Sequence, residues 1–491
     1  SSDLVAARWE RLGDLLEIVG DQPGAAEAQR AACALLTTGA DGGTAGPRNG
    51  EVAAPLARLR AKLAANLINT RRFAEGFAIY EQILAPRGWA VVRPFWQALG
   101  VLVWLRVRIV LWALLPDRWF RRRPTDADAE EMTFLLALMY AVVPLSYVAT
   151  GEYAMRLLLA SRRLHAPNYT LYATVIDLYS QSFFRPLSPA TLRRYRRTLD
   201  RLAQRLPAGE PTMEHAWLLT ARGMLALQDD LGQAVARLEE AVAICRAAGM
   251  LDKREGAFAQ GWLAYACELS GDYARALDLI ATIDGSPLLG VAVFVYCTRT
   301  RIAMRRGQHD EEARQLAAWR ALVPETPIGF ERFWLECRAA ACDAACGRGQ
   351  QVLENLARFA RPFRDTGCLL TAFPAGNWLV PCLEAAIDLQ RSRALTPEQL
   401  RRMEGHARQL ARRGWPDFQP LGYRAQALLA EHQGDHAAAG RFVAQALERS
   451  RRLQDPYHRW LCLEAAREIG VLDAAGAAEA ASLVERYGFA C

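Results

Sequence analysis

The chain has 491 residues, of which 52% are hydrophobic and 23% are charged, and its formal net charge is +7. This composition is typical of a folded globular or repeat protein and excludes an intrinsically disordered chain. The basic residues are almost all arginine, with lysine only at positions 62 and 253, and this bias does not by itself indicate a nucleic-acid-binding protein.

The stretch 6–32, AARWERLGDLLEIVGDQPGAAEAQRAA, predicts two helices separated by a break at positions 20–21. Apolar and small residues share one face of the first helix: Trp9, Leu12, Gly13 and Leu16. Small residues line the second: Ala25, Ala28 and Ala32. We expect Gly13 and Ala25 to let the two helices approach closely, while Trp9 and Leu16 fill the space beside them. The pattern resembles the start of a tetratricopeptide repeat, with Leu16 in the place of the usual aromatic residue.

The same pattern returns along the chain with glycine at the turns. Turns at 271, 307 and 347 follow Gly232 at intervals of 39, 36 and 40 residues, and Gly434 follows 87 residues later. The β-branched run 291–304, VAVFVYCTRTRIAM, falls where a helix is due, so we interpret it as a buried helix. These features predict an all-α fold, a right-handed α-solenoid of tetratricopeptide-like helical hairpins with irregular repeats.

Three segments are expected from the breaks in this pattern. Residues 1–92 form N-terminal helical repeats with a Gly-rich loop at 37–50, and residues 93–130 form a hydrophobic, Trp- and Arg-rich helical segment with a linker. Residues 131–491 form a C-terminal helical-repeat superhelix. A helix at 191–206 carries Leu192, Tyr195, Leu199 and Leu202 on one stripe and arginines off it, which predicts a solvated basic face.

The segment 95–115 is long and apolar enough to span a membrane. Arg106 and Arg108 lie near its centre and offset the gain from its apolar side chains, and they point in opposite directions on a helix. We therefore favour a helix packed within the solenoid or against a partner, and leave membrane-surface association and a membrane span open. The interaction candidates of the longer stretch 95–123 are Trp104, Arg106, Arg108, Trp112, Trp119, Arg121, Arg122 and Arg123.

The sequence predicts no catalytic, cofactor-binding or metal-binding residues. Phosphate-loop, zinc-protease, nucleophile-elbow and C-x-x-C motifs do not occur in it. His432 and His436 fit a solvated turn better than a metal pair, and Cys337, Cys342 and Cys346 fit buried packing better than redox or metal chemistry. An enzyme with a dispersed site near 373–382, around Asn377 and Cys382, is the weakest alternative.

The order of these features along the chain resembles that in the C-terminal repeat region of large bacterial STAND-class signalling ATPases, which carry kinase or cyclase domains. The likeness lies in RWERLGDLLEIVGDQPGAAEAQRAA, RLRAKLAANLINTRRFAEGFAIYEQIL, the Arg- and Trp-rich stretch and YSQSFFRP. The resemblance implies a sensor arm that controls an upstream ATPase or effector domain.

The resulting functional prediction is a non-catalytic module for protein interaction or ligand sensing, with a membrane-associated scaffold as the alternative. Expected partners are a protein or upstream domains of the same polypeptide, with a small ligand and peripheral membrane contact left open and no specific nucleic acid. Eleven scattered cysteines favour free thiols in a reducing cytoplasm, where membrane association remains an alternative.

Overall fold

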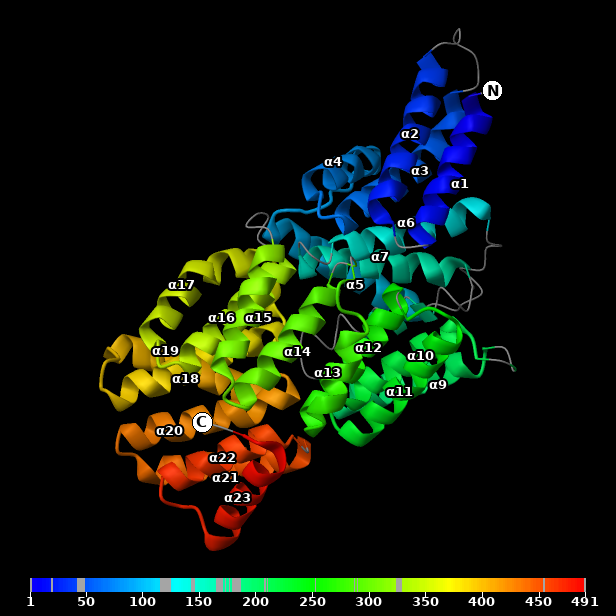
Figure 1. Ribbon diagram of the computed structural model, residues 1–491. Coiled ribbons are helices and arrows are strands. Elements are labelled where there is room, and N and C mark those ends of the chain that lie inside the picture. Colours follow the sequence, from blue (N-terminus) through cyan, green and yellow to red (C-terminus); the bar gives the residue numbers. More distant parts are fainter. Residues whose placement is uncertain are drawn as a thin grey trace. The chain divides into compact units, whose positions relative to one another are not determined.

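The computed structural model of the protein gives an all-α fold, an α-solenoid of helical hairpins (Figure 1). It describes residues 2–18, 21–41, 49–114, 125–142, 146–164, 171–172, 174–175, 177–178, 187–206, 209, 211–251, 253–286, 288, 290–323, 329–453 and 455–489. Contacts divide the chain into two units, unit 1 with residues 1–173 and 287–289 and unit 2 with residues 174–286 and 290–491. No strand occurs in the ranges described.

Unit 1 is built from helices that pack mainly on their neighbours in sequence. They are α1 (Ser2–Ile18), α2 (Gln22–Asp41), α3 (Asn49–Asn69), α4 (Phe73–Leu84), η1 (Ala85–Arg87), α5 (Phe95–Leu114), α6 (Asp126–Val142) and α7 (Tyr147–Leu164). Seven residues of the expected Gly-rich loop are helical, because α2 continues to Asp41 and α3 begins at Asn49, and the loop's residues 42–48 lie outside the described part.

The first hairpin confirms part of the expected packing. A methyl group on Gly13 would lie 2.9 Å from Gln29 Cγ and 3.3 Å from the Ala25 carbonyl oxygen, so α1 and α2 approach at the expected pair. The predicted role of Trp9 is wrong, because its side chain is 39% exposed and does not fill the helix interface. Ala6, one turn earlier on α1, is buried instead.

Unit 2 continues the hairpin pattern. Its helices are α9 (Pro189–Ala203), α10 (Met213–Ala226), α11 (Leu231–Ala247), α12 (Arg254–Ser270), α13 (Tyr273–Ala281), α14 (Val291–Arg305), α15 (His309–Leu322), α16 (Phe330–Ala345), α17 (Gly349–Asp365), η3 (Cys368–Leu370), α18 (Ala372–Arg391), α19 (Pro397–Arg413), η4 (Pro416–Phe418), α20 (Gln419–His432), α21 (His436–Leu453), α22 (Pro456–Glu468) and α23 (Ala474–Tyr487). The run 291–304 is a helix, as predicted, and α9 buries the predicted leucine and tyrosine stripe.

The even-numbered helices of unit 2 form an inner layer. From α10 to α22 each even-numbered helix contacts the next one, and α12 also contacts α22. The inner helices therefore curve until the start and the end of the array meet. The Tyr265 hydroxyl of α12 donates to Asp417 Oδ2 at 2.5 Å across a separation of 152 residues, and Tyr273 lies 6.4 Å from the Phe489 ring. We call these contacts between the α12–α14 region and residues 417–489 the seam.

Aromatic side chains fill part of the space that the inner helices enclose. Phe373 of α18 is the centre of this group, with its ring 6.3 Å from Trp262, 5.5 Å from Trp334 and 5.5 Å from Trp415. Gly376, one turn later, leaves room for the Phe418 ring, which a methyl group there would overlap. The prolines and glycine of 373–382 thus lie inside a continuous helix and permit close packing.

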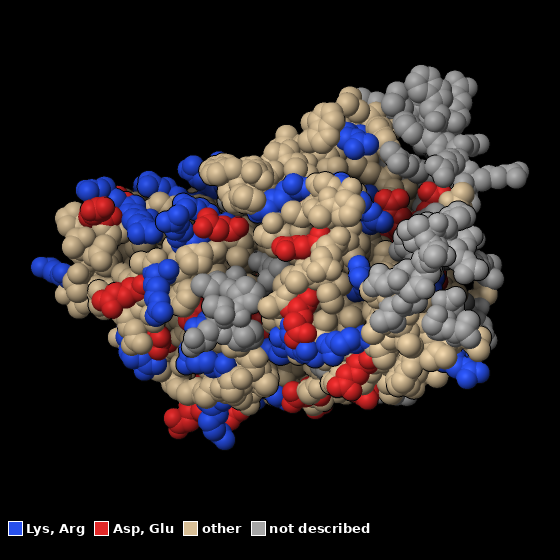
Figure 2. Space-filling view, turned by 90° about the horizontal axis from the view of Figure 1, so that it is seen from above, with Lys and Arg blue, Asp and Glu red and all other residues tan. Residues whose placement is uncertain are grey.

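On the face of the molecule in Figure 2, charged side chains of both signs are scattered among uncharged residues, and basic and acidic side chains are interspersed. Many form exposed pairs, such as Arg237 with Glu240 at 3.3 Å. Exposed pairs of this kind contribute little to stability, typically less than about 1 kcal/mol each. The ion pairs that decide the local structure are therefore the buried ones.

Candidate functional site

The inner helices of unit 2 enclose a cavity of about 600 Å³. Its walls come from α12, α14, α16, α18, α20 and α22, with His309 at the start of α15 and Phe418 of η4. Small ligands usually occupy pockets of about 300–1,000 Å³ that combine apolar walls with a few polar groups. This cavity fits that description and is the candidate functional site.

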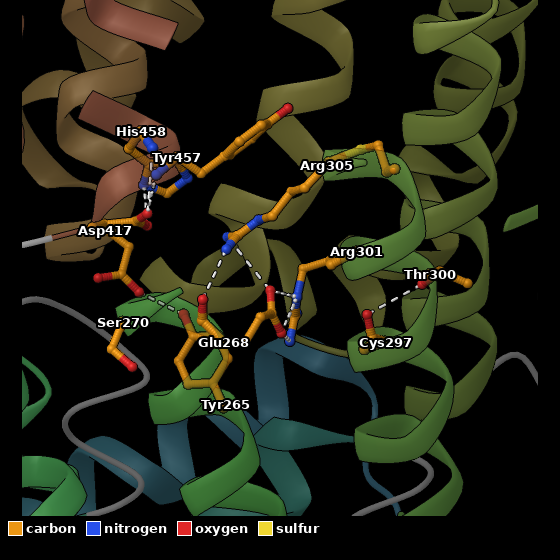
Figure 3. A network of polar contacts seen from close by, with 12 residues as sticks. Tyr265, Glu268, Ser270, Cys297, Thr300, Arg301, Arg305, Asp417, Tyr457 and His458 are labelled. Carbon is orange, nitrogen blue, oxygen red and sulfur yellow. Dashed lines mark hydrogen bonds and ion pairs between the residues drawn. The ribbon is translucent and has the colours of Figure 1, made fainter. Parts of the chain in front are cut away.

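Arg301 and Arg305 form one wall, because residues four apart on α14 share a face. Both form ion pairs with Glu268, which is fully buried on α12. Arg301 donates from Nε to Oε1 at 2.7 Å and from Nη2 to Oε2 at 2.7 Å, while Arg305 Nη2 lies 3.4 Å from Oε1. Arg305 also donates from Nη1 to the Glu268 carbonyl oxygen at 3.1 Å (Figure 3).

Two further buried arginines come from other inner helices. Arg338 of α16 donates from Nε to Thr300 Oγ1 at 3.3 Å and lies 3.5 Å from the buried Glu312 carboxylate. Arg424 of α20 donates to Glu384 Oε1 at 2.5 Å. The cavity therefore collects four guanidinium groups that are each mostly shielded from solvent.

The seam supplies the next part of the wall. Asp455 caps α22 by accepting hydrogen bonds from the Tyr457 and His458 backbone NH groups at 3.0 and 3.3 Å. This cap places the Tyr457 ring 4.8 Å from the Arg305 guanidinium. Burial alone would raise the pKa of Asp455, but His458 and Arg305 beside it hold that pKa below its usual value.

The pKa of Asp417 is raised, whereas that of Asp455 is lowered. Burial raises the pKa of its carboxyl to about 6, although the hydrogen bond from Tyr265 and the nearby His458 and Arg305 act against the rise, and Asp455 adds to it. In an unfolded chain the pKa of an aspartate is about 3.9. The folded protein therefore holds this proton more tightly than the unfolded chain.

Asp417 should accordingly make unit 2 less stable as the pH rises. With a folded pKa above the unfolded one, its contribution is fully present below pH about 4 and is lost as the pH rises through about 6, a change of about 2–3 kcal/mol. Urea unfolding of the wild type and of Asp417→Asn over this range measures the effect. The wild type should lose stability relative to the variant as the pH rises, and parallel pH profiles would refute the assignment.

Several buried atoms of the residues that line the cavity have no hydrogen-bond partner. Among the described lining residues these atoms are all nitrogens: Arg305 Nε, His309 Nδ1, Arg424 Nε, His458 Nδ1 and Trp460 Nε1. The two histidines face carboxylates, with His458 Nδ1 2.9 Å from Asp455. The two arginine Nε groups and the indole NH remain as donors, and a buried donor left unpaired costs about 1–3 kcal/mol. All three are shielded from solvent, so a ligand with acceptor atoms would pair with them once the lining side chains move to admit it.

The more exposed side of the cavity carries both signs of charge. Arg391 lies 2.6 Å from Glu468 and 3.0 Å from Asp388, and Arg467 lies 2.7 Å from Glu464. These carboxylates are between a quarter and two-fifths exposed, in contrast to the fully buried Glu268. Solvent-accessible pairs can rearrange at low cost, so this side is suited to ligand entry.

The interaction candidates from the sequence lie in unit 1 and not at this cavity. Trp104 is 59% exposed on α5, whereas Arg106, Arg108 and Trp112 are half-buried. The Arg108 guanidinium lies 5.5 Å from the Trp112 ring. The remaining candidates fall outside the described residues: Trp119, Arg121, Arg122 and Arg123.

Helix α5 is only partly buried in the structure. Its stretch Phe95–Trp112 is the one segment, among the described residues, with the length and apolarity of a membrane span, and only 22% of it is buried. Unit 1 therefore covers one face of the helix and leaves the other open. Cover by a partner or a membrane stays a prediction.

The histidine and cysteine alternatives are placed as follows. His432 ends α20 and His436 begins α21, so they lie on different helices, and no group of potential metal ligands occurs among the described residues. Cys337 and Cys342 are buried, while Cys346 at the end of α16 is exposed. Burial raises the pKa of the Cys342 thiol to about 12, which keeps it protonated at neutral pH.

Of the two residues named for the dispersed-site alternative, Asn377 lines the cavity, whereas the charged lining residues were not predicted from the sequence. Their signal is a charged side chain within an otherwise apolar inner helix, as with Glu268 in WLAYACELS and Arg301 in VFVYCTRTRIAM. Charges seldom remain buried unless they are paired. The separate segments give no indication of which arginine meets which carboxylate.

No protein-family model matches the chain, and no curated protein matches it significantly. The fold and the cavity therefore define the class of the protein, an all-α solenoid whose inner helices enclose a site lined with arginine and aromatic residues.

Proposed function

We propose that the chain is a non-catalytic, ligand-sensing repeat module of a bacterial signalling protein that controls an ATPase or effector domain upstream of it. The observation that carries the sensing role is the cavity of about 600 Å³, whose lining residues include three buried donors without partners, Arg305 Nε, Arg424 Nε and Trp460 Nε1. The link to an upstream domain rests on the resemblance of the sequence to STAND-class proteins.

The lining indicates the class of ligand. The unpaired donors require an anionic or otherwise acceptor-rich group, such as a carboxylate or a phosphate. Tyr265, Tyr457 and Trp460 offer ring faces or edges beside these donors, which suits a flat apolar body. The proposed ligand is a small planar molecule that carries a carboxylate or phosphate group.

The seam suggests how binding would be transmitted. Arg305 lies near the start of the closed array, whereas Arg424 and Trp460 lie near its end. A ligand that accepts hydrogen bonds from both sides would bind the closed array more tightly than an opened one. Binding then raises the fraction of molecules with a closed array, to the extent that the ligand binds the closed array more tightly than the opened one.

Other partner classes have less support. The mixed charges of the face in Figure 2 do not form the continuous basic track that nucleic-acid backbones require. A protein segment remains the alternative occupant, because solenoids commonly bind partners on their concave surface.

The test is a thermal-shift screen of the full chain against aromatic carboxylates and nucleoside monophosphates, with inorganic phosphate and sulfate as the baseline. A ligand at a hundred times its Kd adds about 2.7 kcal/mol to the stability of the folded state. For a unit of this size that corresponds to a Tm increase of about 5 °C. If no compound exceeds the baseline, the proposal fails.

A pair of tryptophan variants locates the site. Trp460→Phe removes an unpaired NH group at the cavity and should weaken a hit by about tenfold, the value of one hydrogen bond to a charged acceptor. Trp319→Phe removes an equally unpaired and buried NH group on α15, outside the lining, and should leave affinity unchanged. Equal effects of the two changes, measured by calorimetry, would place binding elsewhere.

A further inference from the structure

One face of α5 is apolar and exposed from Trp96 to Leu111. Its members are 44–77% exposed, and they are Trp96, Val103, Trp104, Val107, Val110 and Leu111. At 3.6 residues per turn these positions fall within about a third of the helix circumference, centred near Val107. No charged residue lies between them on that face. At a rise of about 1.5 Å per residue the face is about 23 Å long.

The opposite face of α5 packs on protein. Ala98, Leu102, Leu105 and Ile109 are buried at helical spacing. Ala98 and Leu102 form a cluster with Val148 of α7, which also carries the buried Glu152 ion-paired to Arg156. To span a membrane, α5 would have to leave this cluster. A helix that keeps its packing on α7 can enter a membrane only through its open face.

The two arginines of α5 lie along the edges of the open face. Arg106 and Arg108 directly precede and follow Val107, so they are rotated from it by about 100° in opposite directions. Their opposite orientation argues against a single polar face, as the sequence indicated. It also places one long basic side chain at each border of the apolar face, where such side chains extend toward lipid headgroups.

The sequence around α5 is strongly cationic. Between Glu81 and Asp126 it contains eight arginines and one acidic residue, Asp117, which is a net of +7. A second stretch of this kind is 178–209, with seven arginines and one acidic residue, Asp200, which is a net of +6. The apolar face of α5 thus lies within a strongly cationic part of the sequence.

We propose that α5 docks in the plane of an anionic membrane surface, with its open face immersed by about 5–10 Å at the level of the headgroups and upper acyl chains. The tryptophans suit that depth, and the surrounding arginines meet the anionic lipids. A second copy of the chain is disfavoured as occupant, because it would bring two segments of the same high positive charge together. The proposal is independent of the cavity in unit 2.

Flotation of the full chain tests the proposal, with vesicles of phosphatidylcholine alone and of phosphatidylcholine and phosphatidylglycerol in equal parts. We expect binding to the anionic vesicles at low salt, at least about tenfold weaker binding to the neutral ones, and release at high salt or by an alkaline wash. Val103→Glu combined with Val107→Glu should reduce binding by at least about tenfold, because both charges would enter the bilayer interface.

The matched control is Val471→Glu, which changes an equally exposed valine outside α5 and should bind like the wild type. Circular dichroism and Tm establish that each variant is folded. Four results overturn the proposal: no flotation of the folded wild type, equal binding to neutral vesicles, retention after the alkaline wash, which indicates a span, and a wild-type dimer in light scattering that the double variant dissociates.

Discussion

Replacing Glu268 with glutamine should destabilise unit 2 by about 3–5 kcal/mol, the usual cost of leaving a buried charge without its partner. Glu268 is fully buried and is the carboxylate shared by Arg301 and Arg305. Glutamine keeps the size and one acceptor oxygen but removes the negative charge. Two guanidinium groups would then lie inside the protein with no formal counter-charge on α12. Urea unfolding followed by circular dichroism measures the loss.

The control is Glu240→Gln on α11, whose carboxylate is 54% exposed and pairs with Arg237. An exposed pair contributes at most about 1 kcal/mol, so this variant should unfold close to the wild type. If Glu268→Gln is no more destabilising than Glu240→Gln, the buried ion-pair network does not hold the inner helices together.

The second large effect is expected from Gly271→Ala at the seam. Gly271 has φ +84°, and a methyl group there would lie 2.8 Å from Tyr487 Cδ1 and 3.1 Å from Pro456 Cγ. A left-handed alanine costs about 1–2 kcal/mol, and overpacking adds about 1–3 kcal/mol. The Tyr487 ring is itself stacked 5.4 Å from Phe489, so it cannot move aside freely. We expect a total loss of about 2–5 kcal/mol in the free energy of unfolding.

Gly434→Ala separates the two causes. Gly434 ends α20 with nearly the same backbone angle, φ +81°, but no atom lies within 4 Å of a methyl group there. It should therefore show only the backbone cost of about 1–2 kcal/mol. The difference between the variants reports the contact between the α12–α13 turn and the end of the chain. Equal losses would mean that the seam is not closed.

Much of the fold can be predicted from the sequence, because its turns are local. The glycines predicted to end helices at 271, 307, 347 and 434 all have positive φ. That conformation is accessible to glycine without strain, so the residue marks the turn wherever it occurs. The close approach at Gly13 and Ala25 follows from side-chain size in the same way.

The cavity could not be predicted, because it depends on how far the array curves. Tyr265 and Asp417 are separated by 152 residues, and neither belongs to a recognisable motif. Small deviations in each hairpin add up over the array, and they decide whether α12 meets α22. The total curvature of the array cannot be predicted from a spacing of 36–40 residues between turns.

The exposed face of helix α5 is a second feature that could not be predicted from the sequence. Its apolarity and its two arginines are visible in the sequence, and they left packing, surface docking and spanning open. The face that contacts α7 is fixed by the stripe Ala98, Leu102, Leu105 and Ile109, which cannot be distinguished from the other valines and leucines of so apolar a helix. Only the fold shows which side remains open.

Hydrogen-exchange mass spectrometry of the full chain, with and without the compound that raises Tm most in the screen, tests the central claim that the cavity is the sensing site. Added protection should appear in α12, α14, α20 and α22, which supply Tyr265, Arg305, Arg424 and Trp460. The other helices should change little. Protection that falls on unit 1 or on the outer helices of unit 2, with the inner helices unchanged, would contradict the claim.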